Sequence, residues 1–349
     1  MALWTGRGFA SDNNSGVLPE ILQAIAEANT NHTAAYGDDP WTEKAKEVFE
    51  NHFGGGVEVY FVFNGTAANV LALSSCARSF ESIYCTDLAH IYEDECGAPE
   101  RFIGSKLIPI ENENGKLTPH KLIPKIEGLG NQHHVQPKVI SISQTTEVGT
   151  VYDLQELKAL SQVARDHGLY FHMDGARISN AAAALGKTFR EFTSEIGVDV
   201  LSFGGTKCGL LGAEAVVFLN SNLAKDFIYR RKQGMQLASK MRFIAVQFST
   251  FLTEQLWLKN ALHANQMASY LEEKVKGIQE LEIAYPVQAN GVFAWLPKHL
   301  VPILQKQVPF YIWRAGEKKD LVRWMMSFDT TKEDVDTFAD LIKEILTQK

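Results

Sequence analysis

A lysine that follows a predicted buried strand is the residue in this sequence that most suggests chemistry. Residues 198–203 are β-rich and largely apolar, Gly204 and Gly205 end the run, and Lys207 follows before more glycine-rich chain. Its small neighbours do not shield the amine. A dehydrated lysine has a lowered pKa and becomes a nucleophile toward carbonyl groups. Alone, the same pattern also describes a surface lysine in a turn, so other residues have to decide.

An acid ends another predicted strand in the same way. Residues 169–173 form an apolar run, and Asp174 comes directly after it. A carboxylate at the end of a buried strand is unfavourable unless it meets a positive charge. Arg177, three residues further on, is one candidate partner, and a bound cationic heterocycle is another.

A third candidate site is the pair Gly65-Thr66. Residues 57–63 predict a strand, and the small residues from Ala67 to Cys76 predict the helix that follows. Free N–H groups, the helix dipole and the threonine hydroxyl would together bind an anion there. The spacing matches neither the Walker lysine motif nor the dinucleotide G-x-G-x-x-G pattern. One phosphate on a small cofactor therefore fits better than a nucleotide, although an ordinary turn has the same pattern.

Other polar residues have two interpretations each. His90 follows the strand predicted at 82–85, where the sites of open α/β sheets lie, but a capping or core histidine is equally consistent. Ser11 and Asn13 either belong to a site or cap the helix that Pro19 opens.

Two further groups are less easily explained. The pair His133-His134 precedes the strand predicted at 139–143 and has no evident structural role. The basic run at 226–232 is either a solvated helix face or an arginine cluster that reaches a phosphate.

The elements that would position these residues alternate between strand and helix from residue 57 to 219. This alternation predicts a mostly parallel sheet covered by helices on both faces. After residue 223 the pattern changes to long helices and three strand-like runs, which is typical of a smaller α+β domain. We therefore predict two domains, a large one at 1–240 and a small one at 241–349.

Composition excludes several classes of function. The formal charge of -7 and the pI near 5.8 give no support for nucleic-acid binding. No apolar run approaches the roughly 20 residues of a membrane span, and the first residues lack a signal pattern, so we expect no membrane partner and a cytoplasmic location. Four cysteines are scattered without zinc spacing, so we expect reduced thiols and no metal site.

In combination, the candidate residues meet the needs of one kind of cofactor. A phosphorylated aromatic aldehyde with a ring nitrogen requires a lysine for a Schiff base, an acid at the ring nitrogen, a ring stacked on its face and a phosphate cradle. Lys207, Asp174, His90 and the Gly65-Thr66 pair supply these four features in this chain.

The sequence resembles the threonine aldolase family, in the branch of phenylserine aldolase and low-specificity L-threonine aldolases. The segments that carry the resemblance are Ser11-Asp-Asn13, Tyr36-Gly-Asp-Asp39, Gly65-Thr-Ala-Ala-Asn69, Ala89-His90, Asp94-Glu-Cys-Gly-Ala-Pro-Glu100, His172-Met-Asp-Gly-Ala-Arg177 and Ser202-Phe-Gly-Gly-Thr-Lys207. The resemblance implies an α/β protein of the aspartate-aminotransferase-like fold, with a mostly parallel seven-stranded sheet and a small C-terminal α+β domain. It also implies a pyridoxal 5'-phosphate enzyme that cleaves L-threonine, L-allo-threonine or phenylserine to glycine and an aldehyde.

The resemblance further implies a role for each matched residue around the cofactor. Lys207 would form the internal aldimine, Asp174 would pair with the pyridinium nitrogen, and His90 would stack on the ring. The residues implied for the phosphate are Gly65, Thr66, Thr206 and, from a neighbouring subunit, Arg231.

For the substrate, the resemblance implies that Arg177 and Arg323, with Ser11, hold the carboxylate. Guanidinium groups suit that task because their planar fork matches a carboxylate. Tyr36 would reach the site of an adjacent subunit. We therefore expect a homodimer or a homotetramer with sites at the subunit interface.

The same resemblance implies how the bond between Cα and Cβ breaks. A base would take the proton of the β-hydroxyl, and the carbanion left at Cα would be held as a quinonoid before protonation to glycine. We assign the base to His90 or to a water held by His90 and His133, although His134 competes for the second position. The alternatives are β-elimination or transamination on the same fold, and a non-catalytic homologue.

Overall fold

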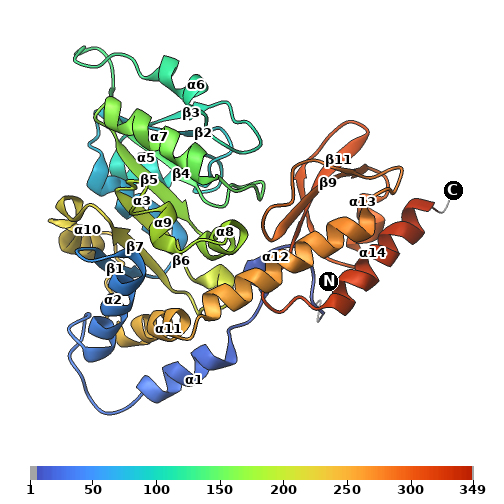
Figure 1. The fold of residues 1–349 in the computed structure, drawn as a ribbon, viewed down its shortest axis with the longest axis horizontal. Coiled ribbons are helices and arrows are strands. Elements are labelled where there is room, and N and C mark those ends of the chain that lie inside the picture. The colour runs from blue at the N-terminus through green and yellow to red at the C-terminus, as the bar shows by residue number, and fades with distance from the viewer. Residues whose placement is uncertain (1–5, 348–349) are drawn as a thin grey trace.

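Residues 6–347 are described by a computed structural model of the chain, in which two sheets form the centres of two packed units (Figure 1). The larger unit is built on a seven-stranded sheet and the smaller on a four-stranded one. The long helix α12 (Leu256–Val275) extends from the larger unit along the smaller one (Figure 1).

The large sheet has the strand order β1-β7-β6-β5-β4-β2-β3, and only β7 runs against the others. This mostly parallel sheet confirms the predicted fold class. Its strands are β1 (Glu58–Val62), β2 (Glu81–Thr86), β3 (Lys106–Ile110), β4 (Gln136–Ser143), β5 (Tyr170–Gly175), β6 (Val200–Gly204) and β7 (Glu214–Phe218).

Both faces of this sheet are covered, which is why its central strands are apolar almost throughout. Leu201 and Phe203 of β6 enter the hydrophobic cluster on one face, whereas Val200 enters the cluster on the other. Helices α2 and α11 pack on the first face, and α3 and α10 pack on the second.

Several helices of the large unit begin at a side-chain cap. Asn64 caps α3 by accepting the N–H of Ala67, and Asp153 forms a capping box with Glu156 at the start of α7. The first ten α-helices among the described residues are α1 (Pro19–Ala28), α2 (Pro40–Phe53), α3 (Gly65–Cys76), α4 (His90–Glu93), α5 (Ala98–Ile103), α6 (Pro119–Leu122), α7 (Leu154–Asp166), α8 (Ile178–Leu185), α9 (Phe189–Phe192) and α10 (Phe227–Gln233).

The smaller unit has the strand order β10-β11-β9-β8 and runs antiparallel throughout. The edge strand β10 was not predicted from the sequence, because its side chains are mostly exposed and show no apolar periodicity. Its elements are β8 (Glu282–Ile283), β9 (Gly291–Pro297), α13 (Val301–Gln305), β10 (Tyr311–Arg314), β11 (Lys319–Met325) and α14 (Lys332–Thr347).

No single boundary in the sequence separates the residues of the two units. Helix α11 (Arg242–Thr253) packs on α1 and α2 of the large unit, although it lies beyond residue 240. Phe9, near the other end of the chain, stacks on Phe338 in the core of the small unit, with ring centroids 4.6 Å apart. Within residues 6–347, no helix is both long enough and apolar enough to cross a membrane.

Candidate active site

Side chains from four strand ends meet at one edge of the large sheet. Ser143 is the last residue of β4, and its register partner Asp174, next to the end of β5, pairs in turn with Ser202 of β6. Because these strands are parallel, the turns that follow them emerge on the same side of the sheet. Lys207 lies in a short 3-10 helix (Thr206–Cys208) that follows β6. His90 is the first residue of α4, which follows β2.

Lys207 has the environment of a nucleophilic amine. Burial lowers its pKa, and the positive charge of Arg177 lowers it further, whereas the carboxylates of Asp12 and Asp174 act against this shift. A lysine with a depressed pKa carries a larger unprotonated fraction near neutral pH. The setting therefore favours covalent chemistry over a solvated surface amine.

The turn that carries Lys207 rests on a buried carboxyl that sequence reasoning did not identify. Glu214 of β7 accepts the N–H of Gly205 at 3.0 Å and is 7% exposed. Burial raises its pKa to about 7, although hydrogen bonds from Thr206 and Gly205 act against the rise. Thr206 also accepts the N–H of Ala213 at 3.2 Å, so its hydroxyl helps to hold this turn.

Asp174 is held by two hydrogen bonds at the end of β5. Its carboxylate accepts Nδ2 of Asn69 at 2.7 Å and the N–H of Ala176 at 2.9 Å. Behind it, His172 lies between the hydroxyls of Ser141 and Ser202, and burial lowers its pKa to about 4. A neutral imidazole supports the strand end without adding a charge.

Arg177 does not pair with Asp174, the partner proposed from the sequence. Its Nε and Nη2 donate to the two carboxylate oxygens of Asp12 at 2.7 and 2.8 Å. Burial would raise the pKa of Asp12, but the charge and hydrogen bonds of Arg177 outweigh it and lower that pKa. Asn290 of the small unit also donates to Asp12, at 3.1 Å. Asp12, 165 residues before Arg177, could not be recognised as its partner from the sequence.

Arg323 of β11 reaches the same region from the small unit. One Nη donates to the carbonyl of Ala10 at 3.0 Å, and the guanidinium lies 5.2 Å from the ring centroids of both Tyr311 and Trp313. Its buried Nε has no partner among residues 6–347. Burial lowers its pKa to about 10. These three side chains line a cavity of about 460 Å³ together with Leu88, Glu93, Asp94, Ile312 and Arg314.

Ser11 lies next to this arginine pair but has a structural task. Its hydroxyl accepts the N–H of Asn13 at 3.2 Å and so caps a short 3-10 helix at Asp12–Asn14. Neither residue caps the helix that begins at Pro19, because that helix starts without a side-chain cap. The turn instead brings Asp12 to Arg177.

His90 contacts two acids that sequence reasoning missed. Its Nδ1 lies 2.9 Å from Oε1 of Glu95, and its main-chain N–H donates to Oε1 of Glu147 at 2.9 Å. The hydrogen bond with Glu95 raises the pKa of His90, and burial acts against it. Burial raises the pKa of Glu147 to about 7. The polar sequence Gln-Thr-Thr-Glu at 144–147, directly after a predicted strand, was the signal that could have identified Glu147.

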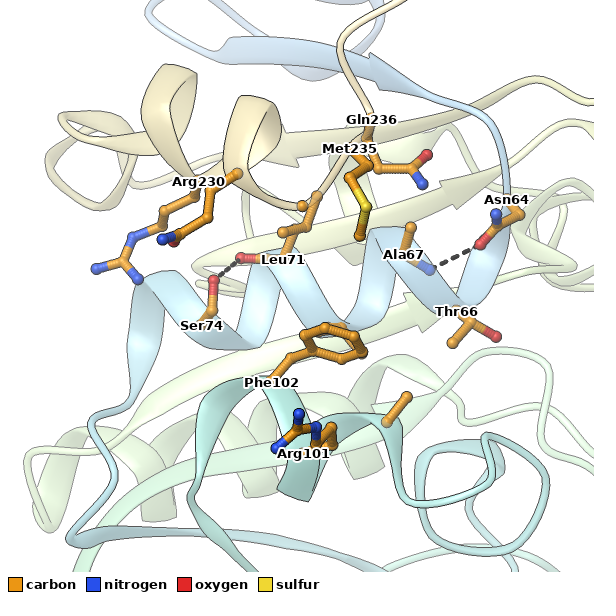
Figure 2. A pocket seen from close by; sticks show the side chains of 14 residues that line it. Asn64, Thr66, Ala67, Leu71, Ser74, Arg101, Phe102, Arg230, Met235 and Gln236 are labelled. Carbon is orange, nitrogen blue, oxygen red and sulfur yellow. Dashed lines mark hydrogen bonds between the residues drawn. The ribbon is translucent and has the colours of Figure 1, made fainter.

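Gly65 and Thr66 form the first turn of α3, as the anion-site prediction requires. Figure 2 shows Thr66 at the N-terminal end of the helix beside the capping Asn64, whereas Ser74 and Arg230 lie toward the other end. A Cβ placed on Gly65 would meet no atom within 4 Å, so there is space for a ligand beside this backbone. A cavity of about 550 Å³ extends along α3, lined in part by Phe102 and Met235 (Figure 2).

His133 was predicted for this site but is not brought to this edge. Arg231 and Tyr36 also lie away from it, and both were expected to serve the site of a neighbouring subunit. His133 and its neighbour His134 are exposed before β4 begins, at the opposite end of that strand from Ser143. Arg231 is buried on α10, with its guanidinium 5.2 Å from the ring centroid of Tyr60. Tyr36 is exposed, with Nζ of Lys232 lying 5.4 Å from its ring centroid.

Comparison with known proteins gives consistent results along the whole chain. Residues 8–298 match the family model described as beta-eliminating lyase. The low specificity L-threonine aldolase of Pseudomonas aeruginosa is 46% identical over 338 residues, which cover 97% of this chain and 96% of that protein. The protein of the same description from another Pseudomonas species is also 46% identical, over 97% of this chain and 98% of its own.

Solved structures agree with the sequence relatives. The threonine aldolase of Leishmania major superimposes with a TM-score of 0.93 at 28% identity, covering 98% of this chain and 100% of that one. Mouse CSAD superimposes with a TM-score of 0.76 at 16% identity, over 97% of this chain and 84% of its own. The second similarity shows the fold alone.

Proposed function

The chain belongs to the beta-eliminating lyase family, with low-specificity L-threonine aldolases among its relatives, and we propose that it cleaves β-hydroxy-α-amino acids to glycine and an aldehyde. It is a carbon–carbon lyase that depends on pyridoxal 5'-phosphate. The proposed substrates are L-threonine, L-allo-threonine and phenylserine.

The residues around Lys207 fit this cofactor. The lowered pKa of Lys207 suits an amine that binds an aldehyde covalently. Asp174 offers a carboxylate, 6% exposed, that can pair with a protonated ring nitrogen. The first turn of α3 presents free N–H groups beside open space at Gly65, where a phosphate can bind. His90 would lie against the ring.

The cofactor, when bound, supplies an electron sink for the charge that develops at Cα of the substrate. The residues of the chain then decide which bond to Cα breaks. Arg177 and Arg323 would bind the substrate carboxylate, and restricting its rotation selects the bond to Cβ for cleavage. Nε of Arg323, which has no hydrogen-bond partner in the described part of the chain, is available for this purpose, and Arg177 is oriented by Asp12.

His90 is the residue we propose to move the proton of the β-hydroxyl. With Nδ1 engaged by Glu95, Nε2 can accept that proton, directly or through one water, as the aldehyde leaves. We do not extend this role to His133, because it lies at the far end of β4.

The observation that carries the proposal is the convergence of Lys207, Asp174 and His90 at one sheet edge beside two arginines. The purified holoenzyme should release glycine and acetaldehyde from L-threonine, and glycine and benzaldehyde from phenylserine. Formation of a keto acid from these substrates, without glycine, would instead support β-elimination, and keto acid from an amino donor would support transamination.

We also propose that the protein is a homodimer or homotetramer with sites near the subunit interface. The support is a set of exposed apolar side chains on α5, α10 and the adjoining segment, namely Phe102, Ile228, Tyr229 and Met235. Tyr36 lies exposed beside Lys232 at the end of α10. Light scattering coupled to size exclusion tests this, and a fully active monomer would contradict it.

A further inference from the structure

A continuous chain of hydrogen bonds joins Asp174 to His90. Nδ2 of Asn69 donates to Oδ2 of Asp174 at 2.7 Å and to Oε1 of Glu95 at 2.9 Å. The same Oε1 lies 2.9 Å from Nδ1 of His90. Asn69 comes from α3, His90 from α4, Glu95 from the turn before α5 and Asp174 from β5, so four separate segments build this chain.

The chain is buried except at one end. The side chain of Glu95 is fully buried, and Asn69 is 2% exposed, whereas the side chain of His90 is 37% exposed. A carboxyl group buried in this way is unfavourable unless its hydrogen bonds are satisfied. Oε2 of Glu95 nevertheless has no partner among residues 6–347, so Oε1 makes both of its contacts. The carboxyl group of Glu95 therefore faces His90 and Asn69 and does not face solvent.

The direction of each hydrogen bond follows from the chemistry of the groups. An ionised carboxylate only accepts, so the nitrogen and not the oxygen of the Asn69 amide must face Glu95 and Asp174. Burial raises the pKa of Glu95, but the hydrogen bonds from His90 and Asn69 act against that rise. With Glu95 ionised, the same argument gives Nδ1 of His90 a proton that it donates to Glu95. In the neutral imidazole this leaves a lone pair on Nε2, which makes no hydrogen bond within residues 6–347.

We propose that Glu95 and Asn69 are positioning residues for His90, holding the imidazole with Nδ1–H toward Glu95 so that Nε2 accepts the proton of the substrate β-hydroxyl. This inference rests on the proposed aldolase function. Glu95 thereby selects the tautomer, and Asn69 aligns Glu95 while it also holds the carboxylate of Asp174.

The charges around His90 support this arrangement. The hydrogen bond from Glu95 raises the pKa of His90, and the charges of Asp174 and Glu95 add to that effect, whereas burial and the charge of Lys207 act against it. Glu147 faces the main chain of His90, and its Oε1 is also bound by Ser143. The interactions that raise the pKa of His90 also stabilise the imidazolium that forms when Nε2 receives a proton.

The decisive variant is Glu95→Gln, which keeps the shape of the side chain and removes its charge. We expect kcat/KM for L-threonine to fall by about 100-fold or more, the scale of general acid–base catalysis. The acidic limb of the kcat/KM profile should move to lower pH, because His90 without its carboxylate partner protonates less readily.

A second measurement needs no substrate. In holoenzyme labelled with 15N-histidine, the His90 signals are assigned by their loss in His90→Asn. Nδ1 should carry the proton of the neutral ring in the wild type, and the pKa of His90 should fall in Glu95→Gln. Glu95→Asp, which keeps a carboxylate, should restore part of the pKa, and Glu100→Gln on the exposed face of α5 should leave it unchanged.

The outcomes separate this inference from the proposed function. If the folded Glu95→Gln holoenzyme keeps the His90 tautomer, its pKa and the acidic limb, the positioning role is wrong, and any loss of activity is structural. If the wild type releases no glycine from either substrate, the aldolase function fails, while the NMR titration still reports on the Glu95–His90 pair. Asn69→Ala should lower both the His90 pKa and the affinity for pyridoxal 5'-phosphate, and unchanged values would remove Asn69 from the proposal.

Discussion

At the scale of single residues, this site depends on groups whose pKa values are moved away from their ordinary range. Burial lowers the pKa of Lys207, in the turn after β6, and raises to about 7 that of Glu214, the β7 residue that accepts a hydrogen bond from this turn. An amine that loses its proton more readily lies near an acid that keeps its proton more readily. Both shifts favour the neutral form of the group, because burial disfavours the charged form.

Replacing Lys207 should remove covalent attachment of the cofactor. In Lys207→Ala we expect loss of the visible absorbance of the lysine-bound cofactor and a fall in turnover of roughly 1,000-fold or more, because a positioned amine is lost. Absorbance spectra after dialysis against cofactor-free buffer provide the measurement. Lys225→Ala, at an exposed lysine, is the control, and an unchanged spectrum in Lys207→Ala would mean that another lysine binds the cofactor.

Glu214 should make the stability of the apo-protein depend on pH. Its pKa is higher in the folded chain than the ordinary value of 4.5, so its stabilising contribution is complete below pH 4.5 and is lost as pH rises through about 7. The loss is at most about 3 kcal/mol. Urea unfolding at pH 5 and pH 8 should therefore show a larger loss for the wild type than for Glu214→Gln. Equal losses in the two proteins would contradict the buried, protonated carboxyl.

At the scale of elements, the first turn of α3 has the geometry of an anion site. Asn64 satisfies the N–H of Ala67 at 2.9 Å, which leaves the earlier N–H groups of the helix for a ligand. The apolar side chains of α3 are buried against the sheet, and Asn69 is buried with its amide directed at Asp174 and Glu95. The helix therefore directs its N-terminal end and Asn69 at the site, and its apolar side chains at the core.

Thr66→Val should weaken binding of the cofactor phosphate with little effect on the fold. A hydrogen bond to a charged group contributes about 1.5–3 kcal/mol, which corresponds to roughly a 10- to 100-fold rise in the Kd of pyridoxal 5'-phosphate. Absorbance titration of the apo-protein measures this value. Ser74→Ala serves as the control, because the Ser74 hydroxyl donates to the carbonyl of Leu71 in the same helix. Equal affinities in Thr66→Val and Ser74→Ala would argue against a phosphate at this helix end.

At the scale of the whole molecule, Asp12 connects three parts of the chain. Asp12 lies in the N-terminal segment. It accepts two hydrogen bonds from Arg177 of the large unit and one from Asn290 of the small unit. The same segment packs Phe9 into the small core. Arg177 and Arg323, the arginines proposed to bind the substrate, are thus placed by the docking of the two units and not by either one alone.

Asp12→Ala should reduce both stability and substrate binding. Breaking a buried ion pair leaves an uncompensated charge and costs about 3–5 kcal/mol. We expect a lower urea midpoint and a raised KM for L-threonine. Arg7→Ala breaks the exposed pair with Asp334 and should change the free energy of unfolding by no more than about 1 kcal/mol. Similar effects of the two substitutions would show that the Asp12–Arg177 pair does not join the units.

Several features of the fold and site follow from local sequence patterns. The strands around Asp174 and Lys207 were predictable because burial on both faces of a sheet demands apolar residues, and a charged residue at the end of such a run is conspicuous. The position of Gly65-Thr66 at a helix start was also predictable, because helix caps and periodicity depend on only a few neighbouring residues. These patterns identified the cofactor type and the parallel sheet.

Which side chains meet was decided only by the tertiary structure. The packing of elements far apart in sequence brings Asn69 to Asp174 and Glu147 to His90, and it leaves His133 exposed at the other end of β4. The partner of Arg177 is Asp12 because two units dock across it, not because of spacing along the chain. Local patterns show where a strand ends, but a contact between residues far apart in sequence depends on how the whole chain packs.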